Sequence, residues 1–130
     1  MDVQARRNLL ATSDNPDSRL DYVVTLSGRL GGGDDAAQVA IRYVPDRAIL
    51  EEGCFTAYLD ALGGTDWPTL EAAATAILDD LNNEVVARWV QVTVSTGAER
   101  GERGVEHSVY LEDRQPTWDN PALLARLRRG

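Results

Sequence analysis

The chain has no lysine, and all 13 basic residues among its 130 are arginine. Without a lysine amine the protein cannot form a Schiff base, attach pyridoxal phosphate covalently or use the lysine of a P-loop. Acidic residues outnumber basic ones by 21 to 13, which gives a net charge of −8. Because an acidic surface repels a phosphate backbone, we expect no binding to nucleic acid.

Cysteine and histidine are equally scarce, with one of each. A single cysteine excludes an internal disulfide, and a single histidine among scattered carboxylates lacks the spacing of metal ligands, so we expect no metal. No apolar run approaches the ~20 residues of a membrane span, and the first residues lack a signal-peptide core. We therefore expect a cytoplasmic protein that does not enter a membrane.

What the chain does have is the composition of one globular domain, with 43% hydrophobic residues. We assign the domain to residues 1–130, with residues 1–19 as an irregular arm and residues 113–130 as a tail. Alternating apolar residues predict strands at 21–26, 36–44, 88–95 and 105–111, and helical spacing predicts two helices between the second and third strands. Gly63 and Gly64 separate these helices, Asp66 and Pro68 suit the start of the second, and 121–129 is expected to form a short helical turn.

The centre of the chain resembles a known family. The corner Tyr43-Val44-Pro45-Asp46 is followed by Leu50-Glu51-Glu52-Gly53-Cys54-Phe55-Thr56. This resembles the 7-cyano-7-deazaguanine (nitrile) reductases, the QueF-type branch of the tunnelling-fold (T-fold) superfamily, in which Tyr-Val-Pro-Asp precedes Val-Glu-Ser-Lys-Ser-Leu-Lys. The resemblance covers roughly residues 15–112.

The resemblance implies an α+β T-fold of order β-β-α-α-β-β, an antiparallel sheet with two helices on one face. In this superfamily, copies pair their sheet edges into an oligomeric barrel. A four-stranded sheet with two free edges supports the same expectation, because closing a ring removes both edges. We expect a homo-oligomer, with rings of roughly four or five subunits stacked in pairs.

The residues with which the family performs its reduction have changed. The loop that carries its cysteine is shortened to the glycine-rich stretch 29–35, so the family's thioimidate cannot form there. Asp34 or Asp35 falls near the family's proton-donating aspartate, and Glu51 matches its glutamate. Because the lysines thought to hold NADPH phosphates are absent, we expect no cofactor. An archaeal branch also lacks the NADPH motif but keeps the cysteine, so this chain departs from both branches.

Glu71 is the candidate ligand anchor. Matching Asp79-Asp80-Leu81 to the family's Asn-Asp-Leu places its His-Glu pair on Leu70 and Glu71, so the histidine is lost and the glutamate kept. A carboxylate can accept two parallel hydrogen bonds from a ring N–H and a neighbouring amino group. The alternative is a solvated glutamate that the helix dipole favours in a first turn.

Three further residues allow two interpretations each. His107 lies on an otherwise apolar strand face, so it is either a hydrogen-bonded core histidine or a general acid or base. Cys54, at a helix N-terminus, is either an activated nucleophile or a small core residue beside Phe55. Trp67 either stacks on a flat ligand or fills the core.

Our first hypothesis is a divergent T-fold enzyme that acts on a small planar nitrogen heterocycle, purine-, deazapurine- or pterin-like, by non-reductive acid–base chemistry at a subunit interface. The alternative is a non-catalytic homologue that binds such a ligand or serves in assembly, and an active nitrile reductase comes third. The candidate residues are Glu71 and Trp67 for ligand binding, and Glu51, Asp34, Asp35, His107 and Cys54 for catalysis.

Overall fold

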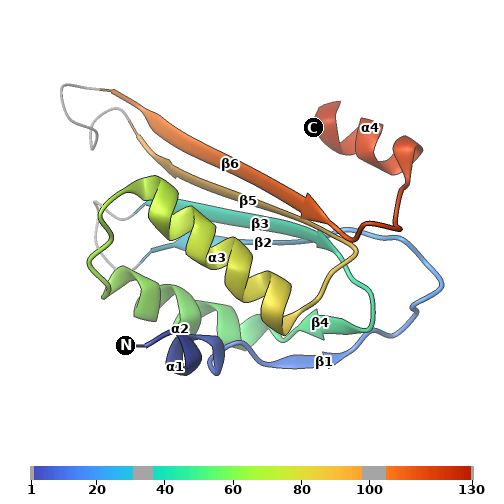
Figure 1. Cartoon of the computed structure of the whole chain (residues 1–130), viewed down its shortest axis with the longest axis horizontal. Coiled ribbons are helices and arrows are strands. Elements are labelled where there is room, and N and C mark those ends of the chain that lie inside the picture. Colours follow the sequence, from blue (N-terminus) through green and yellow to red (C-terminus); the bar gives the residue numbers. More distant parts are fainter. Residues whose placement is uncertain (1, 31–36, 98–104, 130) are drawn as a thin grey trace.

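A computed structural model describes residues 2–30, 37–97 and 105–129 (Figure 1). Four helices and six strands lie in these ranges. The helices are α1 (Val3–Arg7), α2 (Glu52–Gly63), α3 (Leu70–Glu84) and α4 (Pro121–Arg129). The strands are β1 (Thr12–Asp14), β2 (Val24–Arg29), β3 (Gln38–Val44), β4 (Ala48–Leu50), β5 (Trp89–Thr96) and β6 (His107–Arg114).

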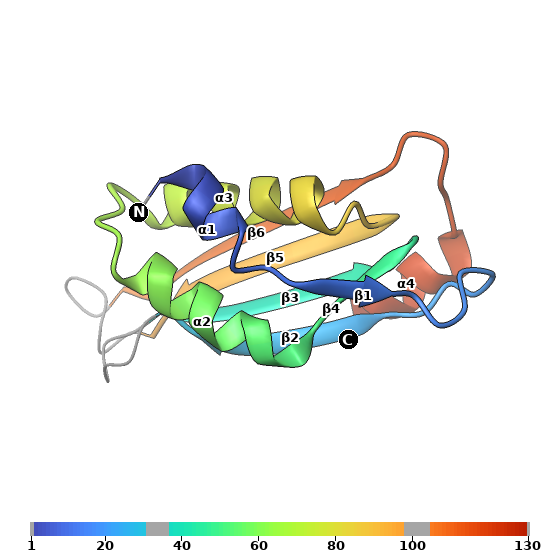
Figure 2. The same ribbon diagram turned by 90° about the horizontal axis from the view of Figure 1, so that it is seen from below.

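The main sheet has four antiparallel strands in the order β2-β3-β5-β6. Helices α2 and α3 lie side by side against one face of it, as Figures 1 and 2 show. This confirms the expected α+β T-fold order. The predicted strand boundaries agree with the observed ones to within about three residues, a normal error at element ends.

The core lies between this sheet and the two helices. Alternate residues of β3 and β5, such as Ile41 and Val92, are completely buried against apolar residues of α2 and α3. On β2, a Cβ at Gly28 would lie 2.7 Å from Leu59 Cδ1, so the lack of a side chain lets α2 approach the sheet closely. Further core residues are Val39, Tyr43, Tyr58, Leu62, Ala74, Ile77, Val90 and Val94.

The expectation of an irregular N-terminal arm was wrong. Residues 3–7 form α1, and β1 pairs with β4 in a second, two-stranded sheet. These elements have no strong local pattern, since all three β1 residues are exposed. Tertiary contacts hold them in place, above all the ion pairs of Arg6 and Arg7 with Asp80.

The tail forms a nine-residue helix, α4, on the face of the sheet opposite α2 and α3. Leu123 and Leu124 are buried there against Val44 and Trp89. The helical turn expected at 121–129 is therefore confirmed, and the helix covers part of the second sheet face. The sequence pattern predicted the helix but did not indicate which surface it covers.

The start of α3 differs from the prediction. The N-cap is Thr69, whose Oγ1 accepts a hydrogen bond from the Ala72 N–H at 3.0 Å, so Asp66 is not the cap. Trp67 and Pro68 precede the helix. The Trp67 indole donates to the carbonyl of Leu62 at 2.8 Å, and this bond holds the connection between the two helices.

Candidate functional site

The structure brings two predicted site residues together. Glu71 lies in the first turn of α3 and His107 is the first residue of β6. Their side chains approach to 3.3 Å between His107 Nε2 and Glu71 Oε1, and they are 47% and 62% exposed, respectively. The core-histidine interpretation of His107 was therefore wrong. Asp34 and Asp35 lie outside the described residues.

The secondary structure around Glu71 and His107 determines where each side chain points. The Thr69 cap starts α3 so that Glu71 stands in the first turn, where the helix dipole favours a carboxylate. On β6, Val109 and Leu111 pack against the core on the helix side of the sheet. Because strand side chains alternate, His107 faces the same side as these two residues and so meets the beginning of α3.

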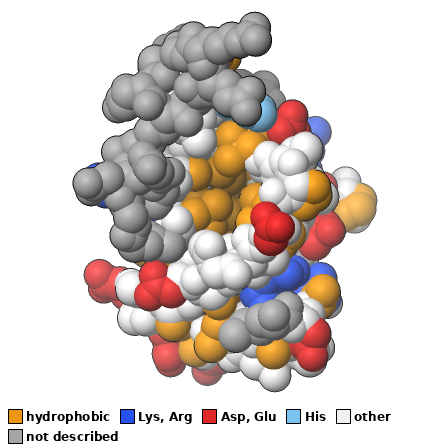
Figure 3. All heavy atoms as spheres, turned by 90° about the vertical axis from the view of Figure 1, so that its left-hand side faces the viewer, with side chains coloured by type: hydrophobic (Ala, Val, Ile, Leu, Met, Phe, Trp, Pro, Cys, Tyr) orange, Lys and Arg blue, Asp and Glu red, His pale blue; other side chains and the backbone are white. Residues whose placement is uncertain are grey.

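An apolar hollow lies at this end of the molecule. Figure 3 shows hydrophobic side chains inside it, with histidine and acidic side chains at its rim. Leu70, directly before Glu71, and Trp67, four residues before it, are partly buried against the core. Leu30 directly follows Arg29, the last residue of β2. The strand register aligns Arg29 across the sheet with Ser108 of β6, so Leu30 lies at the same end of the molecule. A small flat molecule could thus contact apolar surface and the Glu71–His107 pair together.

Trp67 is held by the protein itself. Its N–H is bonded to Leu62, and the Arg6 guanidinium lies over its ring, 5.7 Å from the centroid. A cation over an aromatic face is a stabilising contact. Contacts within the protein therefore already occupy one face of the Trp67 ring and its indole N–H. Stacking of a ligand on Trp67 stays a prediction.

Glu51 and Cys54 lie at the other end of α2. Cys54 is partly buried, with its thiol 3.6 Å from the carbonyl of Ala11, and Glu51 is exposed. Gly63, at the far end of the helix, lies nine positions after Cys54, which corresponds to about 14 Å at a helical rise of about 1.5 Å per residue. Within one chain these two residues are thus separate from the Glu71–His107 site.

A buried polar cluster around Asp80 was not predicted. Asp80 is completely buried and accepts hydrogen bonds from Arg6 Nε at 2.6 Å, Arg7 Nε at 2.8 Å and the Tyr58 hydroxyl. Burial raises the Asp80 pKa, but these bonds outweigh it and hold the pKa below its usual value. An aspartate on the apolar stripe of α3, three residues after Ile77, was the available signal.

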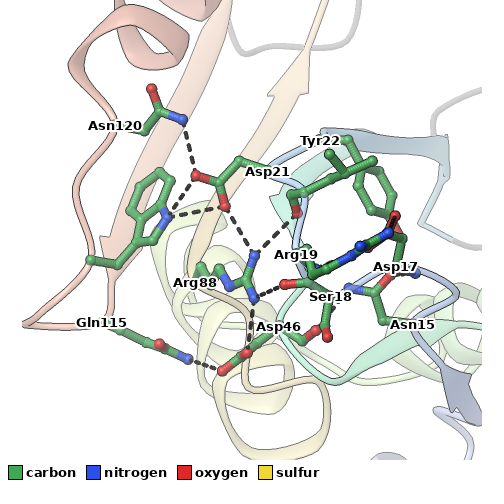
Figure 4. Close-up of polar contacts among 12 residues, drawn as sticks. Asn15, Asp17, Ser18, Arg19, Asp21, Tyr22, Asp46, Arg88, Gln115 and Asn120 are labelled. Carbon is green, nitrogen blue, oxygen red and sulfur yellow. Dashed lines mark hydrogen bonds and ion pairs between the residues drawn. The ribbon is translucent and has the colours of Figure 1, made fainter.

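A second polar cluster surrounds Arg88 at the start of β5 (Figure 4). Its guanidinium donates to Asp21 Oδ1 at 3.0 Å and Asp46 Oδ1 at 3.4 Å, and to the carbonyl of Ser18. Asp21 also accepts from Asn120 Nδ2 at 2.9 Å. The cluster joins the segment before β2, the Pro-Asp corner and the segment before α4, and it has a structural role.

One cleft of about 380 Å³ is lined by residues of the β3–β4 corner and the C-terminal end of α3. None of the predicted site residues lines it. Val86 does, and its φ of 53° is in the left-handed region that β-branched residues rarely adopt. Glu84 lies thirteen residues after Glu71, about 20 Å along α3, so the cleft is distant from the Glu71–His107 pair. The lining residues are Asp46, Arg47, Ala48, Glu84, Val85 and Val86.

Comparison with known proteins shows the family. No family model matches the chain. The NADPH-dependent 7-cyano-7-deazaguanine reductase of Syntrophus aciditrophicus (strain SB) is 30% identical over 119 residues, which cover 86% of this chain and 82% of the relative. The chain belongs to the 7-cyano-7-deazaguanine reductase family. The reductase of Nitrosococcus oceani is also 30% identical, over 122 residues covering 88% of this chain and 92% of the relative.

A solved structure agrees with this assignment. The archaeosine synthase QueF-Like in its apo form matches with a TM-score of 0.59 and 26% sequence identity, over 70% of this chain and 92% of that one. The protein is thus a divergent T-fold member of the QueF family. Its single cysteine lies at the start of α2 and not in the β2–β3 loop, where the resemblance places the family's catalytic cysteine.

The start of α2, where the resemblance places the NADPH motif, does not fit the phosphates of that cofactor. Glu51 and Glu52 stand exposed there, and the chain has no lysine to oppose them. The N–H of Glu51 already donates to the carbonyl of Ala11 in the N-terminal arm, at 2.9 Å. Carboxylates beside a helix N-terminus repel phosphate oxygens, so the residues at this helix start do not suit a nicotinamide cofactor's phosphates.

In the ranges that the structure describes, no three or more of the histidine, cysteine, aspartate and glutamate side chains are grouped so as to hold a metal ion. No helix within those ranges is long and apolar enough to span a membrane.

Proposed function

We propose that this protein binds a small planar nitrogen heterocycle, purine-, deazapurine- or pterin-like, at the Glu71–His107 site and acts on it by acid–base chemistry without reduction. The pair itself carries the proposal: a carboxylate and an imidazole 3.3 Å apart, both accessible, beside an apolar hollow. The relatives named as 7-cyano-7-deazaguanine reductases support a deazapurine as the first ligand class.

Each group has a distinct task. Glu71 accepts a hydrogen bond from a ring N–H, and its charge makes that bond stronger than one between neutral groups. His107 donates or accepts a proton, the task that histidine performs most often in general acid–base catalysis. Addition, cyclisation and hydrolysis are all reactions that such a pair can assist. Asp34 and Asp35 are further candidate proton carriers from the β2–β3 hairpin.

We propose that this site lies at a subunit interface, because we expect copies of the chain to pair their sheet edges in a T-fold barrel. Glu51 and Cys54 lie too far along α2 to reach Glu71 within one chain, so in this proposal they act only if a second copy brings them close. A non-catalytic ligand-binding or assembly protein is the second candidate. The missing loop cysteine and the acidic start of α2 favour it, because both remove parts of the reductase chemistry.

Calorimetric titration tests the proposal. The probes are 7-cyano-7-deazaguanine, guanine and a reduced pterin, each titrated into the wild-type protein, with NADPH as a separate titrant. We expect saturable binding of at least one heterocycle, no binding of NADPH, and no NADPH oxidation when 7-cyano-7-deazaguanine is present. Failure of every heterocycle to bind would refute the ligand site, and binding without any product would favour the non-catalytic candidate.

A further inference from the structure

The cleft beside the β3–β4 corner has two walls that the protein joins by hydrogen bonds. Residues 46–48 of the corner form one wall, and residues 84–86 at the C-terminal end of α3 form the other, around a volume of about 380 Å³. Gln115 connects them, since its Nε2 donates to Asp46 Oδ2 at 3.1 Å (Figure 4) and to the Val86 carbonyl at 3.3 Å. A volume of this size is typical of small-molecule sites.

Further hydrogen bonds fix the backbone of each wall. Asn15, directly after β1, donates from its side chain to the Asp46 carbonyl at 2.7 Å and from its N–H to the Arg47 carbonyl at 2.9 Å. On the other wall, the Val86 N–H donates to the Leu81 carbonyl at 3.2 Å. Because both walls are already ordered, a ligand would lose little affinity to ordering them.

Two oppositely charged side chains of the cleft are open to a ligand. Arg47 is exposed and Glu84 is half-buried. Within the described ranges, the Arg47 guanidinium bonds to no other residue, and Glu84 uses only its Oε2, which accepts from Asn83 Nδ2 at 2.6 Å. The third charged residue, Asp46, is already paired with Arg88. The cleft therefore offers one free cation on one wall and one free carboxylate oxygen on the other.

Val86 adds an apolar contact at a cost in stability. Its φ of 53° is in the left-handed region that glycine adopts without strain and branched residues rarely adopt. Val86 is 55% exposed, so core packing does not offset this strain. Strained backbone with no benefit to the fold points to a binding role. Together with Ala48 and Val85, Val86 gives the cleft an aliphatic surface.

We propose that this cleft binds a small zwitterion with an aliphatic body, of the α-amino-acid class. The ligand carboxylate pairs with Arg47, whose planar guanidinium matches two carboxylate oxygens. The ligand ammonium donates to Glu84 Oε1, and the aliphatic body lies against Val86. This site is separate from the Glu71–His107 pair, because about 20 Å of α3 lies between Glu84 and Glu71.

Calorimetric titration with four probes tests each part of this recognition. Free leucine carries both charges and an aliphatic body, isoamylamine lacks its carboxylate, isocaproate lacks its ammonium group, and free glycine lacks its side chain. We expect wild type to bind leucine with a Kd of about 1 mM or tighter, and each of the other three probes about tenfold more weakly or worse.

Matched variants locate the binding site. Arg47→Gln and Glu84→Gln each remove one charge of the cleft, so the affinity for leucine should fall about tenfold or more. Arg126→Gln and Glu52→Gln, the same changes at exposed positions elsewhere, should bind leucine as wild type does. Val86→Gly should bind leucine about threefold more weakly or worse, yet melt at or above the wild-type temperature. A purely structural role of Val86 would not lower the affinity.

Three results would overturn the inference. Leucine that does not bind wild type at millimolar concentration would show that the cleft is not such a site. Isoamylamine or isocaproate binding as tightly as leucine would exclude recognition of a zwitterion. Unchanged leucine affinity in Arg47→Gln and Glu84→Gln, both folded by their melting temperatures, would place the ligand elsewhere. None of these results bears on the heterocycle site, which is tested with other probes and other residues.

Discussion

His107 Nε2 lies 3.3 Å from Glu71 Oε1, across the boundary between the sheet and the helical layer. One residue begins a strand and the other stands in the first turn of a helix, so the contact depends on the T-fold arrangement of β6 and α3. The rest of the fold keeps these two ends in place.

Replacing Asp80 by asparagine should strongly destabilise the protein. The change removes the negative charge that Arg6 and Arg7 share in the interior and so leaves two cations without their partner. Removing one partner of a buried ion pair costs about 3 to 5 kcal/mol of unfolding free energy. Urea denaturation measures this loss. Asp79→Asn, at an exposed neighbouring position of α3, is the control and should change stability by less than about 0.5 kcal/mol.

Stability should fall in acid, and Asp80 should cause much of the fall. Its pKa in the folded protein lies below the value in the unfolded chain, so the unfolded state binds more protons as the pH drops. The stabilisation by Asp80 is thus complete above the unfolded pKa of about 3.9 and is lost as the pH falls through the folded pKa. Unfolding free energies measured from pH 7 to pH 3 should decline more steeply in wild type than in Asp80→Asn, and parallel curves would contradict this role.

Substituting Val86 by glycine should stabilise the protein by up to about 1 kcal/mol. Its φ of 53° is strained for a branched side chain, by roughly 1 to 2 kcal/mol, and glycine relieves this strain at some cost in chain entropy. Val86 as a whole residue is 55% exposed, so little burial is lost. Val86→Ala keeps a Cβ and serves as the control in thermal melts. An equal gain in both variants would show that backbone strain is not the cause.

The protein should form a discrete oligomer larger than a dimer. In the described ranges β2 and β6 have a strand neighbour on one side only, and such edges expose unpaired backbone groups. Native mass spectrometry at micromolar concentration measures the assembly. A stable monomer under these conditions would rule out the barrel and the interface position of the site.

The sequence was sufficient for the sheet and its helices because buried residues alternate with less buried ones along most of β3, and valines recur at every second position of β5. The helices α2 and α3 have apolar stripes. It was insufficient for α1 and β1, whose positions depend on Arg6 reaching Asp80 from a distant part of the chain. Periodicity put His107 on the correct face of β6. It did not show that the first residue of this strand stays accessible beside the start of α3.

The most direct test of the account compares Glu71→Gln with Glu52→Gln, the same change in the first turn of α2. Calorimetry measures the affinity for a heterocycle that wild type binds, and melting temperatures report on folding. Loss of the charged acceptor should cost about 2 to 4 kcal/mol of binding, roughly thirty- to thousandfold. The fold should lose no more than about 1 kcal/mol, because an exposed glutamate in a first turn contributes little. The account predicts this affinity loss for Glu71→Gln alone, and unchanged affinity in that variant would contradict it.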